Sequence, residues 1–171
     1  MAEHLLRRRL EDAGLEARVA SAGLLRAGLP AQPYGVDVGL ALGLDMAAHR
    51  SRSMTRDILA DAELIVGMAR EHVREAVVLD PALWPRTFTL KELVRRGEAA
   101  GPRQAGEPLS GWLARVGEGR RVSDLAGSSP ADDVDDPIGM PRTAYERMAR
   151  ELDDLTRRLV AVAFAGALTP R

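Results

Sequence analysis

The sequence predicts a doubly wound α/β fold, in which helices flank a parallel sheet. Two observations lead to this class. Residues 62–68 contain the continuous apolar run Leu64-Ile65-Val66, which is typical of a strand buried on both faces of a parallel sheet. Segments with helical periodicity lie before and after this run, and a second short apolar segment follows at residues 87–90. Strands that alternate with helices in this way indicate a doubly wound α/β domain.

The first element is an amphipathic helix that begins at Met1. Its apolar residues recur at helical spacing, and Gly14 follows as a C-terminal stop: Ala2, Leu5, Leu6, Leu10 and Ala13. Residues 17–22 are short and mildly apolar, so we expect a weak strand that ends at Gly23.

The next segments carry clear helix boundaries. Pro33 suits the first turn of a helix that runs through Leu42 and ends at Gly43. Thr55 is expected to cap a short helix that carries Ile58 and Leu59.

The strand at 62–68 is followed by a predicted helix over residues 70–78. Pro81 and Pro85 then break the chain before the strand at residues 87–90. Together these segments form a strand–helix–strand unit.

The remainder contains a long loop and a long helix. We expect one domain over residues 1–171 with a loop insertion at about 97–132, rich in Gly, Pro, Ser and Asp. Within it, Trp112, Leu113 and Val116 suggest a short helix that docks on the body. The final helix has a heptad-like stripe of Tyr145, Met148, Leu152, Leu155, Leu159 and Val162. This stripe spans fewer than three heptads, so packing on the sheet is favoured over a coiled coil.

Composition narrows the class of protein. Of 171 residues, 46% are hydrophobic and 29% charged, and the net charge of −1 argues against a general nucleic-acid or membrane-surface role. No apolar stretch is long enough to cross a bilayer, and the charged N-terminus differs from a secretory signal. We therefore expect a cytoplasmic protein.

Four segments, in this order, resemble the low-molecular-weight protein-tyrosine phosphatase family. They are residues 1–10; Ser21-Ala22-Gly23 with Gly28-x-Pro30-Ala31; Gly43-Leu44-Asp45 through His49-Arg50-Ser51-Arg52, residues 58–66 and Met68-x-Arg70-Glu71-His72; and Asp136-Pro137 with Gly139 and Tyr145-Glu146. Each match alone is weak, but their order and spacing make the resemblance specific. It implies a flavodoxin-like sheet whose central first strand is missing from this chain.

The resemblance also implies a chemistry. The family hydrolyses phosphomonoesters in two steps through a cysteinyl-phosphate, with phosphorylated proteins or small aryl phosphates as substrates and no cofactor. By resemblance, Asp136 is the general acid and Ser21 hydrogen-bonds near the phosphate-binding loop. From the residues alone, an Asp-Pro turn in a solvated acidic loop is the favoured interpretation of Asp136, and the family match reverses this preference. For Ser21, a serine at a strand end fits the sequence as well as the role in the family does.

Three further aspartates lie close to Asp136 in the sequence. Asp132, Asp133 and Asp135 could raise the pKa of a neighbouring acid. This acidic cluster lacks EF-hand spacing, so it predicts no metal site. His49, with Arg50, reads as solvated charge, and His72 has no second histidine near it in the sequence, so neither is expected to bind a metal.

The family's first helix follows a Cys-x5-Arg phosphate-binding loop, and this loop is absent here. The chain has no cysteine, so it contains no nucleophile, and we expect it to be inactive as given. One hypothesis places the missing loop in residues ahead of Met1. A second makes the chain a non-catalytic phosphoprotein-binding module. A third, an arsenate reductase on the same fold, is disfavoured because the thioredoxin-coupled type needs further cysteines.

Two further expectations follow from the resemblance. Ile138 and Leu24-Leu25 stand where the family often has aromatic residues, so the preference for an aryl leaving group is open. Without its central strand the sheet leaves backbone groups unpaired, so we expect the chain to be unstable or prone to aggregation.

Overall fold

The computed structural model describes residues 1–164, and this part of the chain divides into two compact units. Unit 1 comprises Met1–Ser53 and Asp135–Arg157. Unit 2 comprises Met54–Val134 and the described residues from Arg158 onward.

Unit 1 begins with helix α1 (Ala2–Asp12), which buries Leu5 and Leu10. The helix ends before Gly14, whose φ of 69° is a left-handed conformation that favours glycine. Helix α2 (Pro33–Ala41) has proline in its first turn. Both helices confirm the sequence predictions.

Residues 17–22 do not form the predicted strand. The described part of this region pairs only through isolated bridges, between Gly23 and Ser53 and between Pro30 and Arg50. The carbonyl of Val19 instead accepts a hydrogen bond from Arg7 Nη2 at 2.9 Å. The segment was mildly apolar but no ladder partner forms beside it, and a strand requires one.

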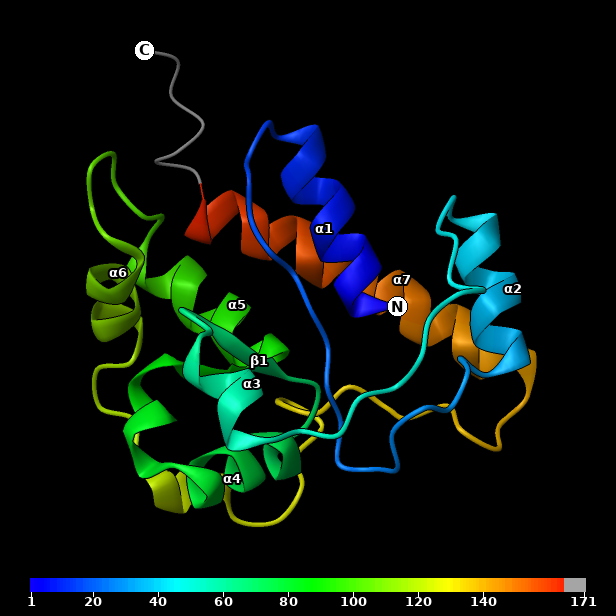
Figure 1. Cartoon of the computed structure of the whole chain (residues 1–171). Helices are drawn as coiled ribbons and strands as arrows, with labels where there is room; N and C mark the ends of the chain where they lie inside the picture. The colour runs from blue at the N-terminus through cyan, green and yellow to red at the C-terminus, as the bar shows by residue number, and fades with distance from the viewer. Residues whose placement is uncertain (165–171) are drawn as a thin grey trace. The chain divides into compact units, whose positions relative to one another are not determined.

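The centre of unit 2 is a strand–helix–strand unit. Strand β1 (Ile65–Gly67) pairs in parallel with β2 (Thr87–Thr89), with Val66 opposite Phe88. Helix α4 (Arg70–Leu79) connects the two strands and contacts both (Figure 1). The predicted parallel sheet flanked by helices is thus confirmed, although both strands are shorter than the apolar runs suggested.

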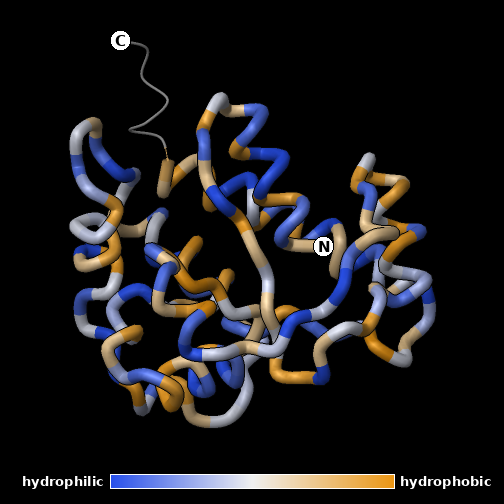
Figure 2. The backbone as a smooth tube through the Cα atoms, in the orientation of Figure 1, coloured by the Kyte–Doolittle hydropathy of each residue, from blue (hydrophilic) through white to orange (hydrophobic). Residues whose placement is uncertain are grey.

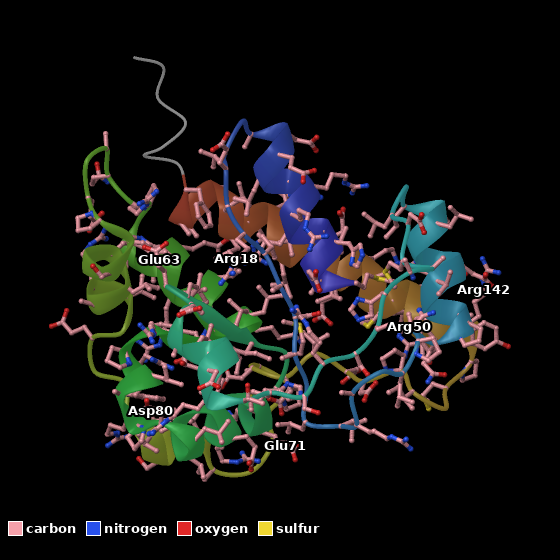
Figure 3. All side chains as sticks on the ribbon, viewed as in Figure 1. Arg18, Arg50, Glu63, Glu71, Asp80 and Arg142 are labelled. Atoms are coloured by element: carbon pink, nitrogen blue, oxygen red, sulfur yellow. The ribbon has the colours of Figure 1, made fainter. Side chains whose placement is uncertain are left out.

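Caps set the boundaries on either side of this unit. Thr55 Oγ1 accepts a hydrogen bond from Ile58 N at the start of α3 (Arg56–Ala60), as predicted. Asp80, labelled in Figure 3, accepts one from Ala82 N at 3.0 Å and starts the 3₁₀ segment η1 (Pro81–Arg86). The two prolines therefore break the α-helix and continue the chain as a 3₁₀ turn.

A helix extends into the start of the segment at about 97–132 that was expected to be a loop insertion. Helix α5 (Leu90–Ala100) runs through Gly97 and is capped by Thr89, which accepts a hydrogen bond from Glu92 N at 3.1 Å. The predicted docking helix is confirmed as α6 (Leu109–Val116), and its fully buried Trp112 packs on α5. A short 3₁₀ turn, η2 (Val122–Leu125), follows. Helix α5 was not predicted from the sequence, because glycine has a low helix propensity and Gly97 lies within this helix.

Helix α7 (Arg142–Ala163) is the longest described helix and confirms the predicted final helix. Five of the six residues in its apolar stripe are buried, and Met148 is half-buried. Along the helices, apolar and polar residues alternate as expected for amphipathic segments (Figure 2). None of the helices over residues 1–164 has the length and apolarity needed to cross a membrane.

Candidate functional site

Ser21, one of the two predicted site residues, contacts the first turn of α1. Ser21 Oγ donates a hydrogen bond to Glu3 Oε2, and Arg7 Nη2 pairs with Glu3 Oε1 from one helical turn away. Burial works to raise the pKa of Glu3, but the hydrogen bonds from Ser21 and Arg7 outweigh it and lower this pKa. Ser21 is therefore a partner of a carboxylate rather than a free hydroxyl. Sequence reasoning missed Glu3, although its spacing of four residues from Arg7 is an available signal.

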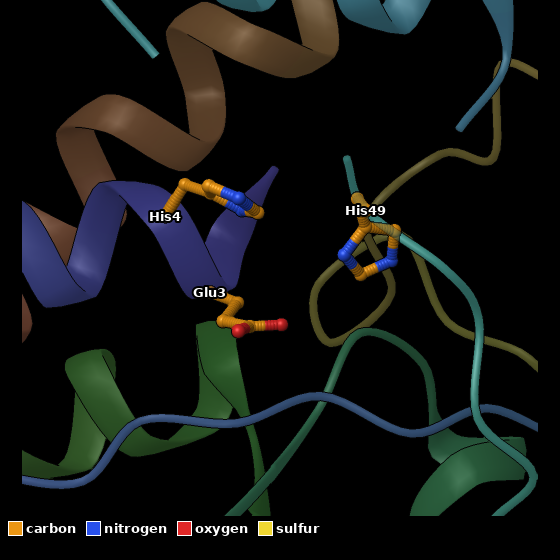
Figure 4. A group of neighbouring side chains, drawn as sticks. All are labelled: Glu3, His4 and His49. Carbon is orange, nitrogen blue, oxygen red and sulfur yellow. The ribbon is translucent and has the colours of Figure 1, made fainter. Parts of the chain in front are cut away.

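Two histidines lie beside this carboxylate. The rings of His4 and His49 meet edge to face with centroids 5.7 Å apart. One donor atom from each of Glu3, His4 and His49 lies within 4.8 Å of the other two (Figure 4). His49 was expected to be solvated charge, and this is wrong, because its half-buried ring lies against His4. Arg50 is exposed as expected and donates to the carbonyl of His49 at 2.8 Å (Figure 3).

His4 has an unusual environment for a histidine. Among the described residues, its Nδ1 is buried and has no hydrogen-bond partner. Burial lowers the pKa of His4, with a smaller opposing effect from Glu3. The neutral imidazole is therefore favoured at neutral pH.

Asp136, the other predicted site residue, lies on an exposed turn before α7. Its Oδ1 accepts a hydrogen bond from Ile138 N at 3.0 Å, and Pro137 beside it is buried. Asp136 lines an open cavity of about 450 Å³ together with Asp135, Arg147 and Glu151. Both predicted residues belong to unit 1, and Ser21 is not among the residues that line this cavity.

The acidic neighbours proposed for Asp136 are divided between the units. Asp135 shares its cavity, whereas Asp132 and Asp133 belong to unit 2. Asp132 forms ion pairs with Arg70 at 2.7 Å and with Arg95 at 2.9 Å. Asp133 accepts hydrogen bonds from the backbone N–H groups of Arg70 and Ser129, both at 2.7 Å. Each of these two carboxylates therefore has structural partners of its own.

Comparison with known proteins identifies the class. The sequence model described as low molecular weight phosphotyrosine protein phosphatase matches residues 1–106. This match covers more than half of the chain, so the chain belongs to this family. Its parallel sheet with flanking helices is the architecture of the family's solved structures.

Individual relatives agree with this assignment. The chain is 33% identical over 93 residues to the probable low molecular weight protein-tyrosine-phosphatase EpsP of Ralstonia solanacearum, covering 54% of this chain and 62% of that protein. It is 26% identical over 121 residues to Etp of Escherichia coli K12, covering 68% and 79% respectively. The chain thus spans less than two thirds of the length of EpsP.

Solved structures share the fold over nearly the whole chain. A low molecular weight protein tyrosine phosphatase from T. tengcongensis has a TM-score of 0.68 at 27% identity, covering 93% of this chain and 86% of that one. The YwlE arginine phosphatase from Geobacillus stearothermophilus has a TM-score of 0.68 at 25% identity, covering 98% and 85%.

Proposed function

We propose that this protein is a phosphomonoester hydrolase of the low molecular weight phosphatase family whose 171 residues hold the scaffold and the general acid but not the nucleophile. The observation that carries this proposal is the family match over residues 1–106 in a chain without cysteine. The family reaction needs a thiolate to attack phosphorus, and the sequence has no cysteine to supply one. The 171-residue chain alone should therefore be inactive.

The position of Asp136 supports its role as general acid. Its carboxyl group is exposed at a cavity, where a leaving group could approach it. Arg147 lines the same cavity and could attract the charge of a phosphate group.

The substrate we propose is a phosphorylated protein or a small aryl phosphate, met in the cytoplasm. EpsP and Etp are named protein-tyrosine-phosphatases, whereas the Geobacillus relative is named an arginine phosphatase. Two aliphatic residues stand where the family often has aromatic ones: Leu25 is 70% exposed and Ile138 is 54% exposed. Aliphatic side chains give no ring stacking, so a strict preference for phosphotyrosine is not favoured.

The test compares two forms of the protein with p-nitrophenyl phosphate as substrate. The first is the 171-residue chain, and the second carries a strand and a Cys-x5-Arg loop ahead of Met1. If the DNA upstream of the Met1 codon encodes this segment in frame, that natural sequence is used; otherwise the segment is grafted from a relative. We expect no turnover above buffer for the first form and clear turnover for the second.

Asp136→Asn in the extended form tests the general acid. The amide cannot supply the proton, so the rate should fall by about 10²- to 10⁴-fold. Asp37→Asn, at an exposed site in α2 away from the residues that line this cavity, is the control and should retain the rate. Turnover by the 171-residue chain would contradict the proposal that this chain lacks the nucleophile. An unchanged rate in Asp136→Asn would show that Asp136 is not the general acid. An in-frame stop upstream would favour the non-catalytic module, and binding of a phosphopeptide would then be measured directly.

A further inference from the structure

We propose that Glu3, His4 and His49 form a binding site for a divalent first-row transition-metal ion such as Zn²⁺. Two imidazoles with one carboxylate are a donor set that such ions prefer. The three residues come from the first turn of α1 and from the segment before Arg50, both within unit 1 (Figure 4). This inference does not depend on the proposed phosphatase activity.

The geometry of the cluster is close to what a metal needs. All three donor atoms lie within 4.8 Å of one another. Around a tetrahedral Zn²⁺ with bonds of about 2.0 to 2.1 Å, neighbouring donors are about 3.3 Å apart. The donors must therefore close by at most about 1.5 Å, which small side-chain rotations can provide.

The unpartnered nitrogen of His4 is an independent observation. A buried polar atom without a hydrogen bond is rare in folded proteins and calls for a physical explanation. A coordinated metal supplies one, either by bonding to Nδ1 directly or by reorienting the ring so that this nitrogen meets a partner. Both half-buried rings also lie where a bound ion would be partly shielded from water.

Glu3 already has the outer contacts that a metal-ligating carboxylate needs. Ser21 Oγ donates to one of its oxygens and Arg7 pairs with the other, so the side chain is held in a fixed orientation. Each carboxylate oxygen has a further lone pair, which leaves room for a metal bond. Such second contacts orient metal ligands and increase affinity. The metal would tie α1 to the segment before Arg50 and leave a fourth coordination position for water or an anion.

The experiment measures binding of Zn²⁺ by titration calorimetry and of Co²⁺ by its visible absorption. It uses the full 171-residue chain without a polyhistidine tag. We expect one ion per chain, a Co²⁺ spectrum of four-coordinate type and a rise of the Tm with added Zn²⁺. His4→Gln and His49→Gln should each weaken binding by about 100-fold or more, and Ser21→Ala by about 10-fold.

The third histidine of the chain provides the control. His72 lies in α4 of unit 2, and its Nδ1 accepts a hydrogen bond from Ala69 N at 3.1 Å. Glutamine at this helix position can accept the same bond, so His72→Gln should fold and bind the metal like the wild type. No binding to the folded wild-type chain would overturn the proposal. Equal loss in His72→Gln, or unchanged affinity in both cluster variants, would overturn it as well. Circular dichroism of each variant distinguishes a loss of folding from a loss of metal binding. If a histidine variant does not fold, Glu3→Gln tests the third ligand instead.

Discussion

Arg120 shows how unit 2 places a charge in an apolar setting. Its side chain is 3% exposed, and the guanidinium lies 3.9 Å from the ring centre of Trp84 and 3.7 Å from that of Phe88. It also forms two hydrogen bonds with Glu92, at 2.8 and 3.1 Å. Burial lowers the pKa of Arg120, but an arginine stays charged in proteins. The aromatic faces and the carboxylate together offset the cost of burying this charge.

Asp132 joins two helices of unit 2 through its carboxylate, which makes the stability of this unit depend on pH. Burial works to raise its pKa, but hydrogen bonds from Arg95 and Arg70 outweigh it and hold this pKa below the ordinary value. A group with a depressed folded pKa stabilises the fold fully above its unfolded pKa, near 3.8 to 3.9. This contribution is lost as the pH falls from about 4 through the folded pKa.

We therefore predict that Asp132→Asn lowers the free energy of unfolding at pH 7 by about 1 to 3 kcal/mol. Below about pH 4 the difference from wild type should shrink, because protonated Asp132 has already lost its ion pairs. Urea unfolding between pH 7 and pH 2.5 measures both effects. Asp37→Asn, an exposed site in α2, is the control and should change little. A constant difference at every pH would show that the charge of Asp132 is not responsible.

At the scale of elements, the contact between α5 and α6 depends on the absence of a side chain. A Cβ atom added at Gly97 would lie 2.9 Å from Trp112 Cζ2 and 3.1 Å from Val162 Cγ2. These neighbours are a fully buried indole ring and a buried valine, which cannot move away easily. Trp112 is also fixed by a hydrogen bond from its Nε1 to the carbonyl of Gly101, at 3.0 Å.

Gly97→Ala should accordingly destabilise the protein by about 1 to 3 kcal/mol through overpacking. Helix propensity alone predicts the opposite sign, a gain of up to about 1 kcal/mol. Gly111→Ala in α6 is the matched control, since its nearest neighbour, Pro108 Cγ, is 3.4 Å from the added Cβ. Thermal or urea unfolding of the two variants decides the point, and a stabilised Gly97→Ala would refute the packing argument.

At the scale of the whole molecule, the sheet is small for an α/β protein. Over residues 1–164 it has two strands of three residues each, so each strand has one edge without a strand partner. Unpaired edges promote association with other chains, and two-stranded sheets are of marginal stability.

We predict that the 171-residue chain self-associates at micromolar concentration and unfolds at a low temperature. Size-exclusion chromatography with light scattering measures the association, and a thermal melt followed by circular dichroism measures the stability. The form with a strand added ahead of Met1 is the control and should elute as a smaller species. A monomeric elution with a cooperative, high-temperature melt of the 171-residue chain would show that the two-stranded sheet is sufficient.

Sequence reasoning recovered the elements that depend on local signals. The stripe of α7, the glycine after α1 and the Thr55 cap are all readable within a few residues, because helix periodicity and capping are local. The parallel strand pair was also predicted, since a buried strand leaves a continuous apolar run. Helix α5 was missed because Gly97 is a poor helix former. The reason for a glycine at this position is visible only in the structure, where Trp112 packs against it.

By itself, the sequence determined the fold class, the family resemblance and the absence of a thiol nucleophile, all of which rest on residue identity and short-range pattern. Only the tertiary structure decided which side chains meet. It brought His49 to His4 and Glu3, gave Ser21 a carboxylate partner, and placed Asp132 between two arginines. Such contacts join residues far apart in the chain, and their formation depends on how the intervening segments fold and pack. No local pattern in the sequence encodes that information.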